Sequence, residues 1–378
     1  MSHHNTVLNQ IVKMFPRHEF EALAEVHHVG QKFRSFNRWS QFVAMLVGQL
    51  SSRKSLRDIT ENLKAQRHKL YHLGMRDTSR STLARTNEKQ PYTLFEAMFF
   101  KLLSRCRELA PRHKFKLNAK LYLLDATIID LCLSLFPWAK FRTTKGAVKL
   151  HIGLDADGYL PTFLSLTCGK THEINWARTL KLPRGSFTVF DRGFTDYAWY
   201  RNLHEAGIFF VTRLKSNASF LGLKKRPGRK APGIITDRHI RMLGCPEPLR
   251  LVVYVDPETG KEYRFITNAV HLSAKTVAAL YKERWQIELF FKWIKQNLKI
   301  KTFLGTSKNA VLTQIWIALC VYLVLAYIKF SAKLKLTMQQ ILRLLQLNLF
   351  DRRSLLALFK PPDLQLVVDK QLNLWANL

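Results

Sequence analysis

One face of the stretch from residue 281 to 295 carries side chains that could act on a phosphate. Read as a helix at about 100° per residue, the stretch gathers five polar side chains into an arc of roughly 80°. They are Tyr281, Arg284, Glu288, Lys292 and Lys295. The other arcs are apolar, so the helix should be largely buried, and a buried polar stripe needs partners. One carboxylate among phosphate-binding groups predicts metal and phosphate as those partners; the alternative is a solvated, salt-bridging face.

Two further carboxylates lie in apolar runs that read as strands. Asp125 interrupts the run 121–129, and Asp191 ends the run 186–191. Phosphodiester cleavage needs charge stabilisation on the attacking and leaving oxygens, which two Mg²⁺ ions about 3.5–4 Å apart can supply. Mg²⁺ prefers a few carboxylates together with waters and phosphate oxygens. Three acids from separate segments, with Glu288 as the third, suit that requirement.

The charge balance favours a polyanionic partner. The 378 residues include 60 Lys and Arg against 27 Asp and Glu, which gives a formal net charge of +33. Nucleic acid and an anionic membrane surface both fit such an excess. With 47% hydrophobic and 23% charged residues, the chain has the composition of a globular protein and not of a disordered one.

Other features narrow the compartment. The five cysteines are scattered and form no CxxC pair, which argues against a zinc knuckle and against a secreted disulfide framework. The first 20 residues lack an unbroken apolar stretch, so a signal peptide is not expected. The apolar run 315–328 is shorter than the roughly 20 residues of a membrane span and predicts a buried core helix. We therefore expect a cytoplasmic, nucleoid-associated protein that binds nucleic acid and no membrane.

Residues 1–115 read as a helical domain that could bind DNA. Helical periodicity is clear at 39–50 and again after Ser55. Gly74 then interrupts the pattern before the polar, basic stretch 77–87. This order is compatible with a helix-turn-helix in a major groove, where Arg80 and Arg85 would contact DNA. The alternative is a solvated, basic helical bundle.

Residues 116–215 predict a mixed α/β sheet flanked by helices. Strands are expected at 121–129, 147–154, 160–167, 186–191 and 208–214, and helices at 174–180 and 197–206. The Asp-Gly pair at 157–158 is a hairpin signal. A hairpin-linked run of strands followed by alternating strands and helices is typical of a mixed sheet. Lys145 and Lys149, at the second strand, are candidate DNA contacts.

The rest of the chain predicts an insertion and a return to helices. Residues 216–270 form a β-rich insertion with a basic loop at 223–233 and a hairpin of strands 251–255 and 263–267. Residues 271–330 return to the core through one long helix from 273 to about 298. Residues 331–378 form a C-terminal helical segment, with helices expected at 337–347 and 353–359.

The polar helix also carries a recognisable spacing. Tyr281, two residues, Arg284, three residues, Glu288, six residues and Lys295 resemble the Tyr-Arg-Glu-Lys signature of bacterial insertion-sequence transposases. That family is the hairpin-forming group of DDE transposases, of the insertion sequence family four type. The resemblance runs from about residue 122 to 298, and the preceding helices resemble the DNA-binding segment of such proteins.

The two strand acids fit the same resemblance. Asp125 in Leu-Leu-Asp-Ala-Thr resembles the first acid of the group, and Asp191 in Val-Phe-Asp-Arg-Gly-Phe resembles the second. The resemblance implies an RNase H-like core in which Asp125, Asp191 and Glu288 are catalytic and hold two Mg²⁺ ions, or Mn²⁺ in their place. It also implies DNA contacts by four residues of the polar helix, Tyr281, Arg284, Lys292 and Lys295. Arg192, next to Asp191, is a further candidate DNA contact.

The implied reaction is cut-and-paste DNA transposition. Water nicks one strand at the terminal inverted repeats, the freed 3′-OH attacks the opposite strand, and the resulting hairpin is hydrolysed before the 3′ ends join target DNA. A homodimer would hold two double-stranded ends in the synaptic complex. Family members stack a flipped base on a Trp of the insertion, but residues 205–284 contain no Trp. The aromatic residues that could substitute are Phe209, Phe220, Tyr254 and Phe265.

Three other classes of protein remain possible from the sequence. They are a non-catalytic DNA-binding protein derived from such an element, an unrelated basic nuclease or RNA-processing enzyme, and a membrane-surface protein. The intact acids and cationic stripe count against the first. Weaker site candidates are Asp155 and Asp157, which suit a turn, and the pair His172 and Glu173.

Overall fold

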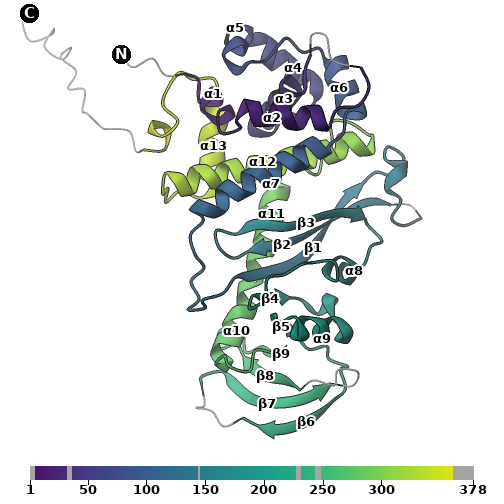
Figure 1. Ribbon diagram of the computed structural model, residues 1–378, viewed down its shortest axis with the longest axis vertical. Helices are drawn as coiled ribbons and strands as arrows, with labels where there is room; N and C mark the ends of the chain where they lie inside the picture. Colours follow the sequence, from purple (N-terminus) through teal and green to yellow (C-terminus); the bar gives the residue numbers. More distant parts are fainter. Residues whose placement is uncertain (1–4, 32–35, 144, 227–230, 243–247, 361–378) are drawn as a thin grey trace, which may run out of the picture.

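The fold is known from a computed structural model, which describes residues 5–31, 36–143, 145–226, 231–242 and 248–360. N-terminal helices lie at one end of the molecule, the sheet occupies the middle, and its last strands reach the other end (Figure 1). Part of the basic loop, at 227–230, and the C-terminal residues 361–378 lie outside the described residues.

The N-terminal region is helical, as predicted. Two of its helices begin at side chains that accept a hydrogen bond from a free backbone amide: Asn37 accepts from Ser40, and Ser55 accepts from Asp58. The α-helices of this region are α1 (Val7–Val12), α2 (Arg17–Val26), α3 (Arg38–Leu50), α4 (Leu56–Ala65), α5 (Arg67–Leu70), α6 (Arg80–Lys89) and α7 (Thr93–Leu109). Every residue of α3 is buried, so α3 is the centre of this region.

Nine strands of the described chain form one mixed sheet. The strands are β1 (Leu121–Leu131), β2 (Gly146–Asp155), β3 (Leu160–Cys168), β4 (Phe187–Phe190), β5 (Phe209–Arg213), β6 (Phe220–Lys225), β7 (Ile234–Met242), β8 (Leu249–Val255) and β9 (Glu262–Thr267). Their order is β3-β2-β1-β4-β5-β9-β8-β7-β6. The pairs β1–β4 and β4–β5 are parallel, and the others are antiparallel.

Alternation along the strands gives the sheet two buried faces. Leu121 and Leu123 of β1 join a large core that includes the N-terminal helices, whereas Tyr122 and Leu124 join a second core. The second core is covered by α8 (Glu173–Ala177) and α9 (Tyr197–Glu205). Asp125 has the parity of Leu121 and Leu123, so it belongs to the face of the large core.

The expected long helix is divided at Arg284. It consists of α10 (Ala274–Glu283) and α11 (Trp285–Asn297). Arg284 keeps right-handed helical angles, but its amide bonds to the Tyr281 carbonyl and its own carbonyl accepts from the amide of Ile287. These bonds span three residues instead of four, so the helix tightens and bends locally. Hydrophobic periodicity continues through the break, which explains why the sequence predicted one helix.

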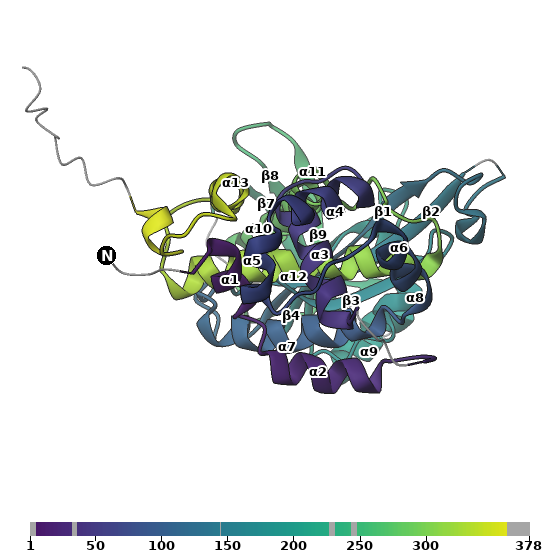
Figure 2. The same cartoon turned by 90° about the horizontal axis from the view of Figure 1, so that it is seen from above.

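The apolar run 315–328 lies inside α12 (Lys308–Ser331). This helix is long and apolar enough to cross a membrane, yet 94% of its most apolar window is buried in the protein. It packs against α7, α3, α6 and α13 (Met338–Asn348), and Figure 2 shows it crossing the molecule beneath the N-terminal helices. Protein packing therefore accounts for its apolar surface, as the prediction of a core helix required.

Two local predictions need correction. The sequence did not predict β6 and β7, and the first residues of the expected basic loop belong to β6. The expected helix at 353–359 is only a short 3₁₀ turn, Ala357–Phe359. The strands of the insertion continue the sheet of the core, because β9 pairs with β5.

Candidate active site

The sheet brings Asp125 and Asp191 to neighbouring positions. Asp125 lies within β1, and Asp191 follows directly after β4. These strands are parallel neighbours, and Leu124 stands opposite Phe190 in their register. The next residue of each strand is an acid, so the two carboxylates leave adjacent strands at the same level.

Arg284 joins the sheet to the third acid. Its Nη1 lies 3.4 Å from Asp125 Oδ2, and its Nη2 donates to Glu288 Oε1 one helical turn further along. The guanidinium thus sits between a carboxylate of β1 and a carboxylate of α11. Because α11 packs on β1, the stripe predicted from helical spacing faces the strand that carries the first acid.

The surroundings of Asp125 oppose its ionisation. Burial raises the pKa of this carboxyl from 3.8 to about 7, and the charges of Asp191 and Glu288 push it in the same direction. The amide of Ala126, which donates to Asp125 Oδ1 at 2.8 Å, and the charge of Arg284 act in the opposite direction. Asp125 is therefore close enough to Asp191 and Glu288 for their charges to raise its pKa.

The donor set suits a hard divalent cation. Asp125, Asp191 and Glu288 offer carboxylate oxygens from three separate elements, and Mg²⁺ is usually held by one or two carboxylates plus phosphate and water. Among the described residues, no three His, Cys, Asp or Glu side chains stand close enough to form a ready metal cluster. The Arg284 guanidinium lies between Asp125 and Glu288 and keeps these two carboxylates apart. Substrate phosphates would therefore have to complete the coordination of any bound ion.

The predicted cations lie at different distances from this centre. Lys292 is exposed on α11, whereas Lys295 donates to the Ile128 carbonyl of β1 at 2.8 Å. Arg192 is exposed beside Asp191 and shares a pocket of about 420 Å³ with His172 and residues 215–217. Lys215 is the further cation in that segment, and no motif in the sequence pointed to it.

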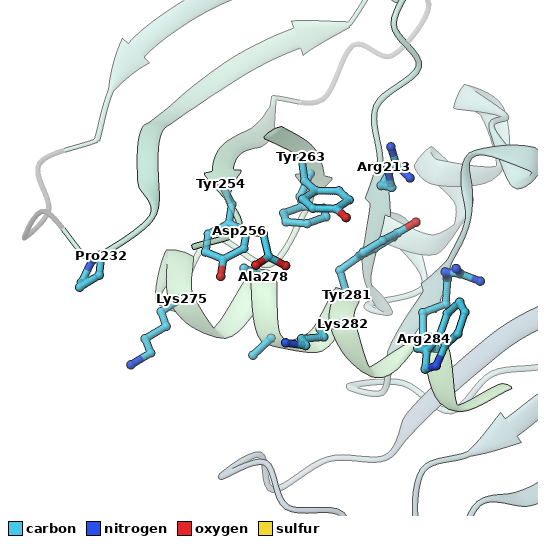
Figure 3. Close-up of a pocket in the computed structure, with 13 residues that line it drawn as sticks. Arg213, Pro232, Tyr254, Asp256, Tyr263, Lys275, Ala278, Tyr281, Lys282 and Arg284 are labelled. Atoms are coloured by element: carbon cyan, nitrogen blue, oxygen red, sulfur yellow. The ribbon is translucent and has the colours of Figure 1, made fainter. Parts of the chain in front are cut away.

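A second pocket, of about 490 Å³, adjoins Arg284 on the side of the insertion (Figure 3). Figure 3 shows Tyr254 and Tyr263 from the insertion strands across from Tyr281 on α10, with Arg213 nearby. Tyr281 itself is buried, packs against Phe265 at 4.8 Å between ring centroids, and lies under the Arg284 guanidinium. The pocket therefore offers aromatic faces beside cations.

The aromatic residues proposed to replace the missing Trp divide into two groups. Tyr254 and Phe265 line the second pocket, whereas Phe209 stacks on Phe187 and Phe220 packs into the second core. Sequence reasoning overlooked Tyr263 and Trp285, which also line this pocket. Trp285 is the residue just beyond the interval 205–284, and its side chain is 55% exposed.

The predictions of DNA contact at Lys149 and along the whole stretch 77–87 need correction. Lys149 is buried, and its Nζ donates to the Thr171 carbonyl and to Glu173, so internal partners occupy it. Asn87, the last residue of the stretch 77–87 predicted to bind DNA, is buried on α6 and accepts from Gln41, so its side chain is not available to a base.

Three further cations predicted to contact DNA are exposed, and the two predicted turn residues lie at a turn. Arg80 and Arg85 on α6 and Lys145 before β2 are exposed. Asp155 and Asp157 pair with Lys120 at the turn after β2, as their turn assignment implied.

Comparisons with known proteins match two families. Residues 117–324 match the transposase DDE domain family. Residues 3–76 match a domain of unknown function, DUF4372. The first match contains all three acids and the whole sheet, and the second covers α1 to α5.

Several relatives carry the name transposase. The chain is 35% identical to transposase y4zB of Sinorhizobium fredii, over 74% of this chain and 80% of that protein. It is 26% identical to a transposase for insertion sequence element IS5377 of Geobacillus stearothermophilus, over 87% and 86% of the two chains. A piggyBac transposase synaptic complex with hairpin DNA is a distant structural neighbour, with a TM-score of 0.43 and 13% identity over 94% of this chain and 80% of that one.

Proposed function

The chain belongs to the transposase DDE domain family, and from this premise we propose that it moves an insertion sequence by binding its terminal inverted repeats, cutting the ends and joining them to target DNA. The observation that carries this proposal is that Arg284 pairs with Asp125 of β1 and with Glu288 of α11, while Asp191 follows the parallel neighbour of β1 at the level of Asp125. Three acids on neighbouring elements, with a cation between two of them, suit reaction at a phosphodiester.

We propose that residues 116–215 and 271–330 form an RNase H-like core. Support comes from the order β3-β2-β1-β4-β5, with antiparallel pairing on one side of β1 and parallel pairing on the other. The acids lie on the central strand, after its parallel neighbour, and on a helix packed against β1. Residues 1–115, 216–270 and 331–378 remain the proposed DNA-binding domain, insertion and C-terminal segment.

In the proposed mechanism, Asp125, Asp191 and Glu288 would hold two Mg²⁺ ions, or Mn²⁺ ions, which would supply charge stabilisation on the attacking and leaving oxygens. Arg284 lies within reach of both Asp125 and Glu288, so it can also meet a phosphate brought to them. Lys292 and Arg192 are exposed and add further positive charge near this centre. Lys295 lies further along α11, where it donates to the Ile128 carbonyl of β1. Strand cleavage, hairpin formation and joining then use the same site in turn.

The pocket beside Arg284 supports a place for an unpaired base next to the cut. Base stacking requires an accessible aromatic face, which Tyr254, Tyr263 and Trp285 provide around one pocket. Trp285 is our choice for the stacking residue that the resemblance implies, because it is the most exposed of the three.

Double-stranded DNA is the proposed partner, held in a homodimeric synaptic complex. The exposed cations of α6 and the strand-flanking Lys145 would contact phosphates outside the cutting site. Such contacts position DNA without reading its sequence, so specificity for the terminal repeat must come from base contacts made elsewhere in the N-terminal domain.

The test is cleavage by the purified full chain on three substrates with Mg²⁺. The substrates are DNA ending in the terminal repeats that flank the gene, DNA of scrambled sequence, and RNA of the same length. We expect cuts at the repeat ends only. Equal cutting of all three substrates would indicate a non-specific nuclease, and tight binding to the repeats without cutting would indicate a DNA-binding protein.

A further inference from the structure

Behind the candidate site, a buried carboxylate is attached to two other parts of the chain. Glu283 is the last residue of α10, directly before the break at Arg284, and it is only 4% exposed. The Tyr159 hydroxyl donates to its Oε1 at 2.5 Å, and Lys114 Nζ lies 2.7 Å from its Oε2. Both oxygens are thus used, which a buried charge requires.

Glu283 lies on the side of the helix away from the reaction centre. Five residues separate it from Glu288, which corresponds to a rotation of about 140°. Arg284 and Glu288 face β1, whereas Glu283 faces the turn after β2. Glu283 therefore cannot contact a substrate held by the three acids, and its effect on them must pass through the helix.

Tyr159 is held in an unfavourable backbone conformation. It follows Gly158 in the turn between β2 and β3, and its φ is +53°, in a region that non-glycine residues seldom adopt. Burial, together with its hydrogen bond to Glu283, raises the pKa of the phenol, so the hydroxyl stays a donor at neutral pH. A strained residue that persists is over-determined by its contacts, and the bond to Glu283 is one of them.

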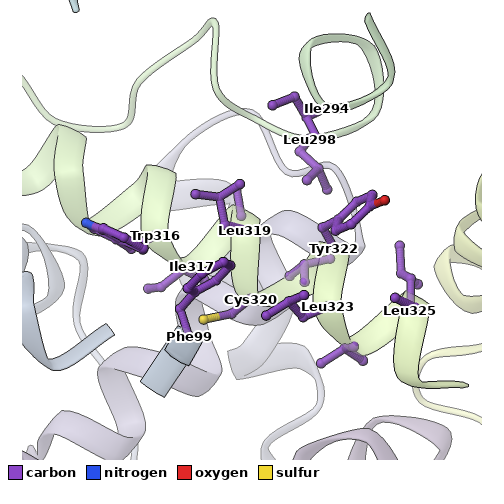
Figure 4. Packing of buried hydrophobic residues seen from close by; sticks show 14 of the residues in the cluster. Phe99, Ile294, Leu298, Trp316, Ile317, Leu319, Cys320, Tyr322, Leu323 and Leu325 are labelled. Carbon is purple, nitrogen blue, oxygen red and sulfur yellow. The ribbon is translucent and has the colours of Figure 1, made fainter. Parts of the chain in front are cut away.

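The same turn is tied to α11 through α12. The Tyr322 hydroxyl donates to the Tyr159 carbonyl at 3.0 Å. The Tyr322 ring packs edge-on against Phe290 and Trp293 of α11, and Figure 4 shows it on the side of α12 that faces Ile294 and Leu298. Tyr159 is therefore connected to the helix on both sides of Arg284: directly to α10, and through Tyr322 to α11.

We propose that Glu283 and Tyr159 are positioning residues, which set the bend at Arg284 and so hold Arg284 and Glu288 opposite Asp125. The inference rests on the proposed function and adds to it two residues outside the acids and the signature spacing. Without the Glu283–Tyr159 bond, α10 loses its attachment to the turn. The angle between the two helices at Arg284 is then restrained only by their packing on the sheet, and the position of Glu288 relative to β1 is held less tightly.

The first test is amide hydrogen exchange of the full chain without DNA or metal, for wild type, Glu283→Ala, Tyr159→Phe and Glu283→Gln. We expect exchange at residues 284–291 to be faster by about tenfold in the first two variants, with α9 unchanged. Glu283→Gln keeps an oxygen that accepts from Tyr159 and should stay close to wild type.

Asp155→Asn is the matched control. Asp155 is as buried as Glu283 and also pairs with a lysine of the segment before β1, but its lysine is Lys120, whereas that of Glu283 is Lys114. Asparagine keeps an oxygen that can accept from the Asp157 amide, so the substitution retains the turn that carries Tyr159. It should lower thermal stability and leave exchange at 284–291 unchanged. Equal acceleration in Asp155→Asn and Glu283→Ala, or none in Tyr159→Phe, would overturn the proposal.

The second readout is the Mg²⁺ concentration at half-maximal cleavage of repeat-end DNA. We expect it to rise about tenfold in Glu283→Ala and Tyr159→Phe, as for other residues that orient metal ligands, and to stay unchanged in Asp155→Asn. A fall in cleavage rate without any shift in the Mg²⁺ requirement would contradict a positioning role. If wild-type protein does not cleave the DNA, the proposed function fails, while the exchange measurement still decides whether Glu283 sets the bend.

Discussion

Asp125 is a carboxyl group in surroundings that oppose its charge. It is held there by its place on a central strand, and burial raises its pKa to about 7. In the unfolded chain its pKa returns to about 3.8. The folded, metal-free protein therefore binds a proton between these two pH values that the unfolded chain does not bind.

This difference predicts a pH-dependent effect of Asp125→Asn. A carboxyl whose pKa is raised in the folded protein adds to the free energy of unfolding at low pH. This contribution is complete below about pH 4 and is lost as the pH rises through 7, and the total loss is up to about 4 kcal/mol. The Asn variant has no such loss. In EDTA, the melting temperature of the variant minus that of wild type should increase from pH 5 to pH 8. A difference that stays constant over this range would contradict the raised pKa.

At the same scale, the sequence around each acid was enough to single out the candidate acids. It was not enough to tell which basic residues are already paired within the protein. A single acid within an apolar, strand-like run is costly to bury without a functional partner, so Asp125 and Asp191 could be recognised as candidate site residues. Lys149 resembled other basic residues, and only the fold shows that Glu173 occupies it. Glu283 and Trp285 adjoin the signature residues, and neither has a spacing that marks it.

The break between α10 and α11 matters at the scale of elements, because it places Arg284 where one fork of donors reaches two acids. Nη1 of Arg284 pairs with Asp125, and Nη2 pairs with Glu288. Lysine carries one point charge and cannot reproduce that geometry. We expect Arg284→Lys to slow single-turnover cleavage on the order of 10²-fold.

The control is Arg343→Lys, the same substitution at an exposed arginine of α13. It should leave both the cleavage rate and the melting temperature close to wild type. Wild-type cleavage by Arg284→Lys would mean that charge alone is needed at this position.

Most core elements followed from periodicity, and those that did not have a physical reason. The strands of the core are buried and apolar, so their limits were predicted to within a few residues. β6 is an exposed edge strand whose residues include Lys224 and Lys225, and its only strand partner in the described chain is β7. Pairing with a distant partner, and not local propensity, makes it a strand.

For the whole molecule, the excess of positive charge should appear as a salt-dependent affinity for DNA. Each phosphate contact contributes about −0.9 to the slope of log K against log salt concentration. We expect the double variant Arg80→Ala/Arg85→Ala to reduce the magnitude of this slope by about 2, one unit per lost contact. A titration of repeat DNA at several salt concentrations measures it.

Lys101→Ala provides the comparison for that measurement. Lys101 is an exposed cation of α7 that pairs with Glu19, so its removal should change the slope much less. Equal slopes for the wild type and the double variant would place the DNA on another surface.

The arrangement of the whole molecule was only partly predictable. The succession of a helical region, a mixed sheet, an insertion and further helices followed from the sequence. That the insertion strands extend the core sheet through β9 and β5 did not, because sheet order depends on contacts between residues far apart in the chain.

The most direct test of the account is Mg²⁺-dependent cleavage of terminal-repeat DNA by Asp125→Asn, Asp191→Asn and Glu288→Gln, beside Asp130→Asn as the control on the same strand. Asp130 is exposed and stands five residues from Asp125, on the other face of β1. The account predicts that each of the three loses cleavage by at least about 10³-fold while still binding the DNA, and that Asp130→Asn cleaves like wild type. Retained cleavage in any one of the three would contradict the assigned site.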